Sequence, residues 1–570
     1  MYFHLLHRRL YWNKIRSKGP EIILLGATAF LQFFRLGIGE IQSWDESLYL
    51  VRAEACVKFG AWFDQTQYAI GGLYSSTHPP LVIWMMAFTR MILGNGVFVS
   101  RLISAFAGVF ALYFFYKLAG RFFSRWVRLF ATVLLGVAQG FLWYSHHAQL
   151  DIPMFAFIVG ATYYAVLAFE TSNTKSAVIS GVLYGCALLT KAFQPLYLIP
   201  FLLILPYILG SKKEYKKLVI LVVTAFIIAA PWYIFMMIIH PDYNSAYAGL
   251  VQSMKTGTYL RVSTKQWWYY INQIIIEFPF LILLPLIIPS LIRNWRSRDT
   301  VFARLSLMSI IWLIGMIGFV SLFQTRMPHF VLFMLLPATL VICVCIEEIL
   351  NSPQKKRNIL LSIILLIPAI IWSGNEYSRK SLREHFSFSL NADVVSLLLI
   401  VILSLIATAI LYRYFSSSRS TVVFLVATIV LFFINFFRFA DRKDEIFIDG
   451  AKQVTDSLMN LPNIHSLSVY EDGTTLESFL PQFNYYSDGW LLGWDNNRWG
   501  SIIPWTKIDS LKRVDSFPLT DASILYISRD VISKPKPEEL ALISGTDQFL
   551  RSKYRKCFYS KKYRLYWGPI

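Results

Sequence analysis

The sequence predicts a polytopic α-helical membrane protein with a small α/β domain at its C-terminal end. The first observation is composition: 56% of the 570 residues are hydrophobic and only 15% are charged, whereas an average globular domain carries about a quarter charged residues. The second is a series of apolar runs close to the ~20 residues that a helix needs to cross a bilayer. The third is a change near residue 441, after which charged residues, Asn, Asp, Gly and Pro become common.

Basic loops between the apolar runs predict how the chain crosses the membrane. Because Lys and Arg collect in cytoplasmic loops, we expect the N-terminus and the following loops to face the cytoplasm: 121–128, 210–217, 293–298, 353–358 and 413–420. The runs between them give thirteen predicted spans: 22–38, 97–118, 129–146, 153–170, 177–190, 195–209, 218–239, 275–292, 302–322, 330–347, 358–373, 394–412 and 421–438. An odd number of spans predicts a transmembrane domain at 1–440 and an extracytoplasmic domain at 441–570.

One apolar segment, residues 79–94, does not fit this count. If it crossed the membrane, every later basic loop would change sides, against the usual charge bias. We therefore expect an interfacial or re-entrant piece, or a long lead into the second span. In the preceding loop, the spacing of apolar residues in 46–63 predicts a helix that lies on the membrane surface.

The C-terminal region carries the patterns of a small mixed domain. Residues 444–460 have helical spacing, and short runs rich in β-branched and aromatic residues predict strands at 466–471, 523–528 and 557–568. A domain of about 130 residues has a usual size.

The net charge of +20 does not indicate nucleic-acid binding. The basic residues lie mainly in short loops between apolar runs, and no basic soluble domain of a recognisable type is present. We expect membrane lipids, and no nucleic acid, among the partners.

Ionisable residues near the outer ends of the predicted spans are the candidates for function, because charge at membrane depth is costly. By the predicted topology, the candidates lie on one side of the membrane together with one neighbouring aromatic residue: Asp45, Glu46, Tyr49, His78, His146, Asp151, Lys191, Arg326 and His329. Several of them have a simpler explanation. Lys191 and Arg326 could be outer-leaflet anchors, the acids could be their salt-bridge partners or a helix N-cap, and His146 could cap a helix end.

A sugar donor linked to a lipid phosphate would use this set of residues. The departing phosphate needs positive charge, which Lys191 and Arg326 supply. The acceptor hydroxyl needs a carboxylate to take its proton, which makes Asp45 the expected base of an inverting displacement. Asp45, Glu46 and Asp151 could also hold a divalent cation, but the nearby cations make a metal less necessary, so we expect no metal and no other cofactor.

Several stretches resemble, in order, the GT-C glycosyltransferases of the protein O-mannosyltransferase and lipid A aminoarabinose transferase type. They are "WDESLYLVRAEACVKFGAWF", "STHPPLVIWMMAFTRMILG", "HAQLDIPMFAF", "GCALLTKAFQPLYLIP" and "FQTRMPHFVLFMLLP". The resemblance covers roughly residues 20–350. It implies a GT-C fold, a polyprenyl-phosphate-linked sugar donor, and transfer to a hydroxyl or phosphate of a lipid, glycan or protein. It also implies an inner-membrane enzyme with its active site on the periplasmic or extracellular side.

The resemblance also assigns roles to particular residues. Asp45 matches the first-loop acid taken as the base, and Asp151 matches the second acid on that face. Lys191 and Arg326 match basic residues, and Arg326 occupies the place of one thought to meet the lipid phosphate; we group His329 with them. His78 stands before the Pro where the aminoarabinose enzymes carry Glu-Lys, a departure that leaves the acceptor open.

Three other classes of protein compete with this interpretation. A lipid-sugar flippase or transporter often shows paired halves and helices broken near mid-membrane. A polymerase or ligase would act on lipid-linked oligosaccharide, and a structural protein would not need the polar set. The concentration of polar residues on one face favours an enzyme.

Overall fold

The computed structural model describes most of the chain up to residue 353 and several parts of the C-terminal region. The described ranges are 21–42, 45–69, 73, 77–211, 214–256, 268–297, 300–353, 357–358, 361–362, 365–366, 450–462, 466–471, 479–487, 501–502, 506–507, 520–527, 537–560 and 562–570. The predicted spans 394–412 and 421–438, and most of 358–373, lie outside these ranges.

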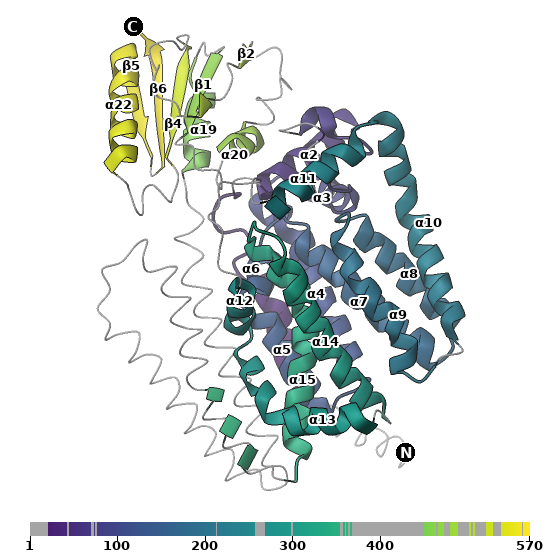
Figure 1. The fold of residues 1–570 in the computed structure, drawn as a ribbon. Helices are drawn as coiled ribbons and strands as arrows, with labels where there is room; N and C mark the ends of the chain where they lie inside the picture. Colours follow the sequence, from purple (N-terminus) through teal and green to yellow (C-terminus); the bar gives the residue numbers. More distant parts are fainter. Residues whose placement is uncertain are drawn as a thin grey trace, which may run out of the picture.

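Long apolar helices form a bundle (Figure 1). Within the described part of the chain, five are long and apolar enough to cross a membrane: α4 (Val97–Ala119), α7 (Asp151–Glu170), α10 (Tyr215–Ile239), α14 (Val301–Ser321) and η6 with α15 (Pro328–Asn351). Each corresponds to a span predicted from the sequence. The basic loop 121–128 and the candidate site residues therefore fall at opposite ends of the bundle, and we call the end with the site residues the outer end, after the predicted topology.

Two predicted spans are broken rather than straight. The predicted helix 129–146 is α5 (Arg125–Val137) followed by α6 (Gln139–Ser145), bent by 59°. The backbone of Ala138 leaves the helical region there, and the Glu277 carboxylate accepts the Gly140 N–H at 3.0 Å, which satisfies a donor at the start of α6.

The predicted straight span 275–292 is likewise wrong in shape. It is α12 (Tyr269–Glu277) followed by η5 (Pro279–Ile287) and α13 (Ile288–Ser297), with a bend of 100° between α12 and the rest. Pro279 explains the bend, because proline cannot donate a backbone hydrogen bond and disfavours helix at the residue before it.

Shorter helices complete the bundle and its outer end. They are α8 (Thr174–Leu188), η3 (Gln194–Leu198) running into α9 (Ile199–Ile208), and α3 (Leu81–Leu93). With 13 residues, α3 is about 20 Å long at 1.5 Å per residue, too short for a hydrocarbon core of about 30 Å. That length agrees with the prediction that 79–94 is not a separate span.

The outer end also holds α2 (Asp45–Phe59), η1 (Thr66–Tyr68) and α11 (Tyr243–Thr256). Figure 1 shows α2, α3 and α11 at the end of the bundle nearest the C-terminal sheet, with α13 at the opposite end. The helix predicted within 46–63 exists, but its expected position on the membrane surface is corrected: Glu46 to Cys56 are all buried, because α2 packs against α3 and the C-terminal region. The helix α11 was not predicted.

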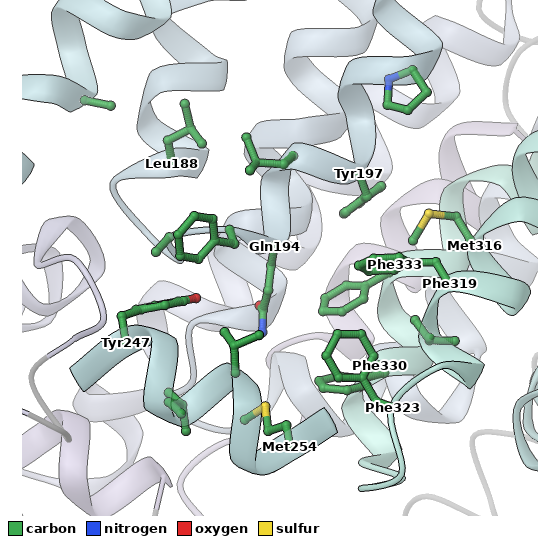
Figure 2. A pocket seen from close by; sticks show the side chains of 18 of the residues that line it. Leu188, Gln194, Tyr197, Tyr247, Met254, Met316, Phe319, Phe323, Phe330 and Phe333 are labelled. Atoms are coloured by element: carbon green, nitrogen blue, oxygen red, sulfur yellow. The ribbon is translucent and has the colours of Figure 1, made fainter. Parts of the chain in front are cut away.

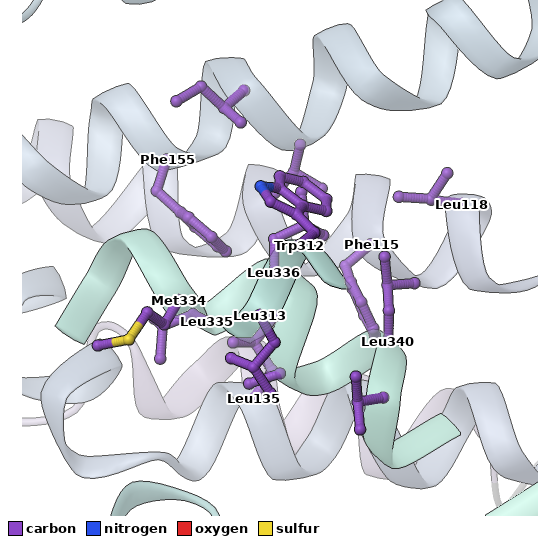
Figure 3. Packing of buried hydrophobic residues seen from close by; sticks show 14 of the residues in the cluster. Phe115, Leu118, Leu135, Phe155, Trp312, Leu313, Met334, Leu335, Leu336 and Leu340 are labelled. Carbon is purple, nitrogen blue, oxygen red and sulfur yellow. The ribbon is translucent and has the colours of Figure 1, made fainter. Parts of the chain in front are cut away.

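Packed aliphatic and aromatic side chains hold the bundle together. Figure 3 shows Phe115 from α4, Leu135 from α5, Phe155 from α7 and Trp312 from α14 meeting Leu336 of α15. The residues of α15 from Leu335 to Ile346 are all buried, so this helix is the centre of the bundle and its neighbours are fixed around it.

The C-terminal region forms a mixed sheet with the strand order β2-β1-β4-β6-β5. Its elements are α19 (Ala451–Met459), β1 (Ser466–Glu471), α20 (Phe479–Tyr486), β2 (Ser501–Ile502), β3 (Thr506–Lys507), β4 (Ala522–Tyr526), α22 (Pro537–Lys553), β5 (Tyr554–Tyr559) and β6 (Tyr563–Pro569). Strand β1 runs parallel to β4, whereas β4–β6 and β5–β6 are antiparallel. The predicted helix and strands correspond to α19, β1, β4 and the β5–β6 hairpin.

The C-terminal region is hydrogen-bonded to the loop that leads into α2. The Glu40 carboxylate accepts the N–H groups of Gly450 and Ala451, each at 3.1 Å, and so caps the start of α19. The Tyr486 hydroxyl accepts the Ile41 N–H at 2.7 Å. These hydrogen bonds connect Glu40 and Ile41, a few residues before Asp45, to the C-terminal region.

Candidate active site

Three of the predicted site residues lie together at the outer end of the bundle. Asp151 is the first residue of α7, and Lys191 lies in the turn that follows α8. The Lys191 Nζ donates to the Asp151 Oδ1 at 2.9 Å, and both side chains are buried. The charges of Lys191 and Asp151 both act on the carboxyl group of Asp45, the first residue of α2. We call these three residues the acid–lysine cluster.

Asp45 has the electrostatic character of a base that works near neutral pH. Burial raises the pKa of its carboxyl group; the Lys191 charge opposes this shift and the Asp151 charge adds to it, for a pKa of about 6. At pH 7 the group is mostly ionised, yet it is more basic than an ordinary aspartate. A catalytic base is most effective when its pKa lies near the working pH.

Two histidines and two tyrosines border the acid–lysine cluster. The Asp151 and Lys191 charges act on both His78 and His329, and the ring of Tyr144 lies 6.5 Å from that of His329. The ring of Tyr49 lies 6.1 Å from that of His78. Burial, with the Lys191 charge, lowers the pKa of His78 to about 3, so its ring is neutral at pH 7.

Glu46, which the sequence groups with the catalytic acids, pairs with Arg101 and does not join the acid–lysine cluster. Its two oxygens accept Nε and Nη2 of Arg101 at 2.7 and 3.0 Å, and they also accept the backbone N–H groups of Ala148 and Gln42, each at 2.8 Å. Both side chains of the pair are fully buried. Burial acts to raise the pKa of Glu46, but Arg101 and these hydrogen bonds lower it to about 2.

Arg326 contacts the end of α14 and the ring of Tyr270, and its predicted contact with a lipid phosphate stays a prediction. Its Nη1 donates to the backbone carbonyls of Val320, Ser321 and Phe323, and its guanidinium stacks over the ring of Tyr270 at 5.7 Å. It therefore satisfies carbonyl groups at the C-terminal end of α14, where cations are favourable.

His146 has the structural role that the sequence left open. Its Nδ1 lies 2.8 Å from the Leu142 carbonyl oxygen, and its Nε2 lies 3.1 Å from that of Phe34. The side chain is fully buried. The His146 ring therefore connects the end of α6 to Phe34, which lies in the first predicted span.

A large apolar cavity of about 1350 Å³ adjoins the acid–lysine cluster. It lies between α9, α10, α11, α14 and η6, and both His78 and Ala192, the residue after Lys191, line it. Figure 2 shows the rings of Phe323, Phe330 and Phe333 on one side, with Leu188 and Tyr247 across from them. The cavity thus has apolar walls, and where His78 and Ala192 line it, the charged acid–lysine cluster lies beside it.

Sequence reasoning missed Tyr144, Arg52 and Arg101. The charges of Asp151 and Asp45 act on Tyr144, which carries no sequence signal because tyrosine is common at span ends. Arg101 stands inside the predicted span 97–118, so the rule that flags charge at membrane depth could have found it.

The prediction that no metal is bound stays a prediction.

The fold is that of a polytopic membrane protein with the GT-C architecture. Residues 77–235 match the family model described as dolichyl-phosphate-mannose-protein mannosyltransferase. Two relatives carry the name undecaprenyl phosphate-alpha-4-amino-4-deoxy-L-arabinose arabinosyl transferase. The one from Pseudomonas savastanoi pv. phaseolicola is 26% identical over 58% of this chain and 62% of its own length. The one from Pseudomonas fluorescens is 27% identical over 66% of this chain and 67% of its own length.

A solved structure confirms the fold over almost the whole chain. It is ArnT from Cupriavidus metallidurans bound to undecaprenyl phosphate, with a TM-score of 0.63 and 15% identity over 97% of this chain and 100% of that one. Together these matches confirm the resemblance that the sequence motifs indicated and agree with the predicted enzyme class, a glycosyltransferase. The chain spans less than two thirds of the length of the first relative.

Proposed function

We propose that this protein is a membrane glycosyltransferase that moves a sugar from a polyprenyl-phosphate-linked donor to an extracytoplasmic hydroxyl or phosphate. The observation that carries the proposal is the junction of the acid–lysine cluster with the apolar cavity: His78 lines the cavity and borders the cluster. A polyprenyl chain needs an apolar channel, its phosphate needs positive charge, and the acceptor needs a base. All three lie within one region.

The proposed reaction is an inverting displacement at the anomeric carbon. The Asp45 carboxylate takes the proton of the acceptor hydroxyl, and the acceptor oxygen forms the new bond to that carbon. The bond between the carbon and the phosphate oxygen breaks, and the lipid phosphate leaves with the electron pair. Lys191 stabilises the charge that develops on it, while Asp151, at 2.9 Å from Lys191, fixes the position of the ammonium group.

The relatives suggest the first donor to test. They are named for undecaprenyl phosphate and 4-amino-4-deoxy-L-arabinose, and the cavity is roomy and apolar enough for a long prenyl chain. A lipid, glycan or protein acceptor on the periplasmic side of an inner membrane is consistent with the site at the outer end of the bundle. His78 stands where the aminoarabinose enzymes carry Glu-Lys, so acceptors other than lipid A belong in the test.

A transfer assay with the purified full-length protein tests the proposal. We expect mass spectrometry to detect a new glycosidic bond on a cell-envelope lipid, glycan or protein when undecaprenyl-phosphate-linked aminoarabinose is supplied. Donors with other sugars, tested in parallel, separate a wrong sugar from a wrong reaction. Movement of the donor between leaflets without any new bond would instead establish a lipid-sugar transporter.

The Lys191→Ala variant is expected to impair donor use more than acceptor use. Removing the ammonium group takes away the charge that balances the departing phosphate, so the donor KM should rise by roughly 10-fold or more. The acceptor KM should change much less. Lys175→Ala, an exposed lysine at the other end of α8, is the matched control and should leave both constants unchanged. Equal losses for donor and acceptor would contradict the phosphate role.

A further inference from the structure

A second buried cation lies beside the cavity, and its charge has no acid partner among the residues that the structure describes. Arg52 is only 1% exposed. Its Nη2 donates to the Gln65 Oε1 at 2.9 Å and to the His78 carbonyl oxygen at 2.8 Å. Its Nε and Nη1 are buried and have no hydrogen-bond partner among the described residues. Donors left in this state cost free energy that a bound acceptor would recover.

Asp64, the acid whose charge acts on Arg52, already pairs with another residue. Asp64 acts on the guanidinium only from a distance, because its Oδ2 pairs with the His240 Nε2 at 2.8 Å. Within the described part of the chain, no carboxylate lies within 4 Å of Arg52. Buried arginines usually have such a partner, since an uncompensated buried charge is strongly unfavourable.

The position of Arg52 aligns it with the acid–lysine cluster. Asp45, Tyr49 and Arg52 are spaced four and three residues apart on α2, so they share one face of the helix. Both the Arg52 and the Lys191 charges act on His78. Tyr243, whose hydroxyl also interacts electrostatically with Arg52, lines the cavity. Arg52 therefore lies at the charged end of the cavity, about 10 Å along the helix axis from Asp45.

We propose that Arg52 binds the phosphate of the lipid-linked donor with its guanidinium charge and a donor that lacks a partner, on Nε or Nη1. These two donors lie on different edges of the planar guanidinium, so one of them donates to a phosphate oxygen in a charge-assisted hydrogen bond. Lys191 is already balanced by Asp151, whereas Arg52 brings a charge that nothing in the described structure neutralises. The spacing of two helical turns leaves room for a sugar ring between the phosphate and Asp45. The assignment rests on the proposed function, since it names a group that holds the same donor.

Binding of two lipids to the full-length protein in detergent tests this assignment. The probes are undecaprenyl phosphate and undecaprenol, which share the chain and differ in the phosphate. For Arg52→Gln we expect affinity for undecaprenyl phosphate to fall roughly 10- to 100-fold, the range for a lost charged hydrogen bond. Affinity for undecaprenol should stay unchanged. Arg52→Lys should fall between the wild type and Arg52→Gln, because lysine keeps the charge but loses the rigid, planar arrangement of the guanidinium donors.

The two probes separate a phosphate ligand from a structural residue. If Arg52 only packs the loop around Gln65, both affinities fall together in Arg52→Gln, and the proposal is overturned. It is also overturned if neither affinity changes. Gln65→Ala, which removes the partner of Arg52 but keeps its charge, should preserve the preference for the phosphate. If Arg52→Gln does not fold, Arg52→Lys decides by the same comparison. Failure of the wild type to prefer undecaprenyl phosphate would instead count against the proposed function.

Discussion

Replacing Asp45 by Asn is expected to abolish sugar transfer while the protein remains folded. The amide keeps the shape of the side chain but cannot accept the proton of an acceptor hydroxyl. General-base catalysis contributes about 10²- to 10⁴-fold to a rate, so kcat should fall by at least about 100-fold. The loss should appear in kcat, because the amide still fits the site and donor binding depends on the cations.

The stability of this variant separates a catalytic acid from a structural one. The folded-state pKa of Asp45 is about 6, above its ordinary value of 3.8, because burial disfavours the charged form. The stabilisation from this group is therefore complete below pH 3.8 and is lost as the pH rises through about 6. At pH 7 the buried, ionised carboxylate therefore lowers the free energy of unfolding. Asp45→Asn should melt at the same temperature as the wild type or above it.

The pH profile gives an independent check on the same residue. Since the ionised form of Asp45 is the active base, wild-type kcat/KM should rise between about pH 5 and pH 7 with a midpoint near 6. Asp242→Asn, which changes an exposed acid next to α11, should keep that profile and full activity. Transfer at the wild-type rate by Asp45→Asn would mean that another group is the base.

Asp45 and Glu46 show the limit of what the sequence predicts about the site. The sequence groups both as candidate catalytic acids because both follow the first apolar run, and their neighbours in the sequence do not distinguish them. Successive side chains on a helix point about 100° apart, so the two acids point in different directions and meet different partners. The ion-pair partner of Glu46 is Arg101, 55 residues later in the chain. A single sequence gives no signal for an ion pair between residues of two distant helices.

The same limit applies to the cations and to the bends. Apolar run length located the long helices α4, α7, α10 and α14 well, because bilayer thickness fixes that length. The bend at Pro279 could have been predicted from the proline, whereas the bend at Ala138 depends on Glu277 from another helix. Arg326 carries the same charge signal as Lys191, but its contacts with the end of α14 depend on how the backbone turns there.

Replacing Glu46 by Gln is expected to have the opposite consequence from Asp45→Asn. Removing the charge leaves Arg101 fully buried without its counter-ion, and breaking such a pair costs about 3–5 kcal/mol. The melting temperature should fall by several degrees or the protein should fail to accumulate. Any folded fraction should keep transferring sugar, because Glu46 does not touch the acid–lysine cluster.

The pH dependence of this contribution also has the opposite sign. The folded-state pKa of Glu46 is lowered to about 2 from an ordinary value of 4.5. The stabilisation is therefore present above pH 4.5 and is lost as the pH falls through about 2, so the destabilisation of Glu46→Gln should be complete at neutral pH. Melting curves in detergent at pH 7 measure it, and Glu170→Gln, which breaks the partly exposed pair with Arg121, should change stability by no more than about 1 kcal/mol.

A double variant distinguishes an ion pair from an acid needed for its charge alone. Replacing Glu46 by Gln together with Arg101 by Met removes both buried charges, and substitution of whole buried pairs by apolar groups is often close to neutral. We expect the double variant to recover much of the stability that Glu46→Gln loses. It will not recover all of it, because the Leu36, Ile38 and Glu40 carbonyls lose the donors of Arg101. If Glu46→Gln melts like the wild type but no longer transfers sugar, Glu46 belongs to the reaction after all.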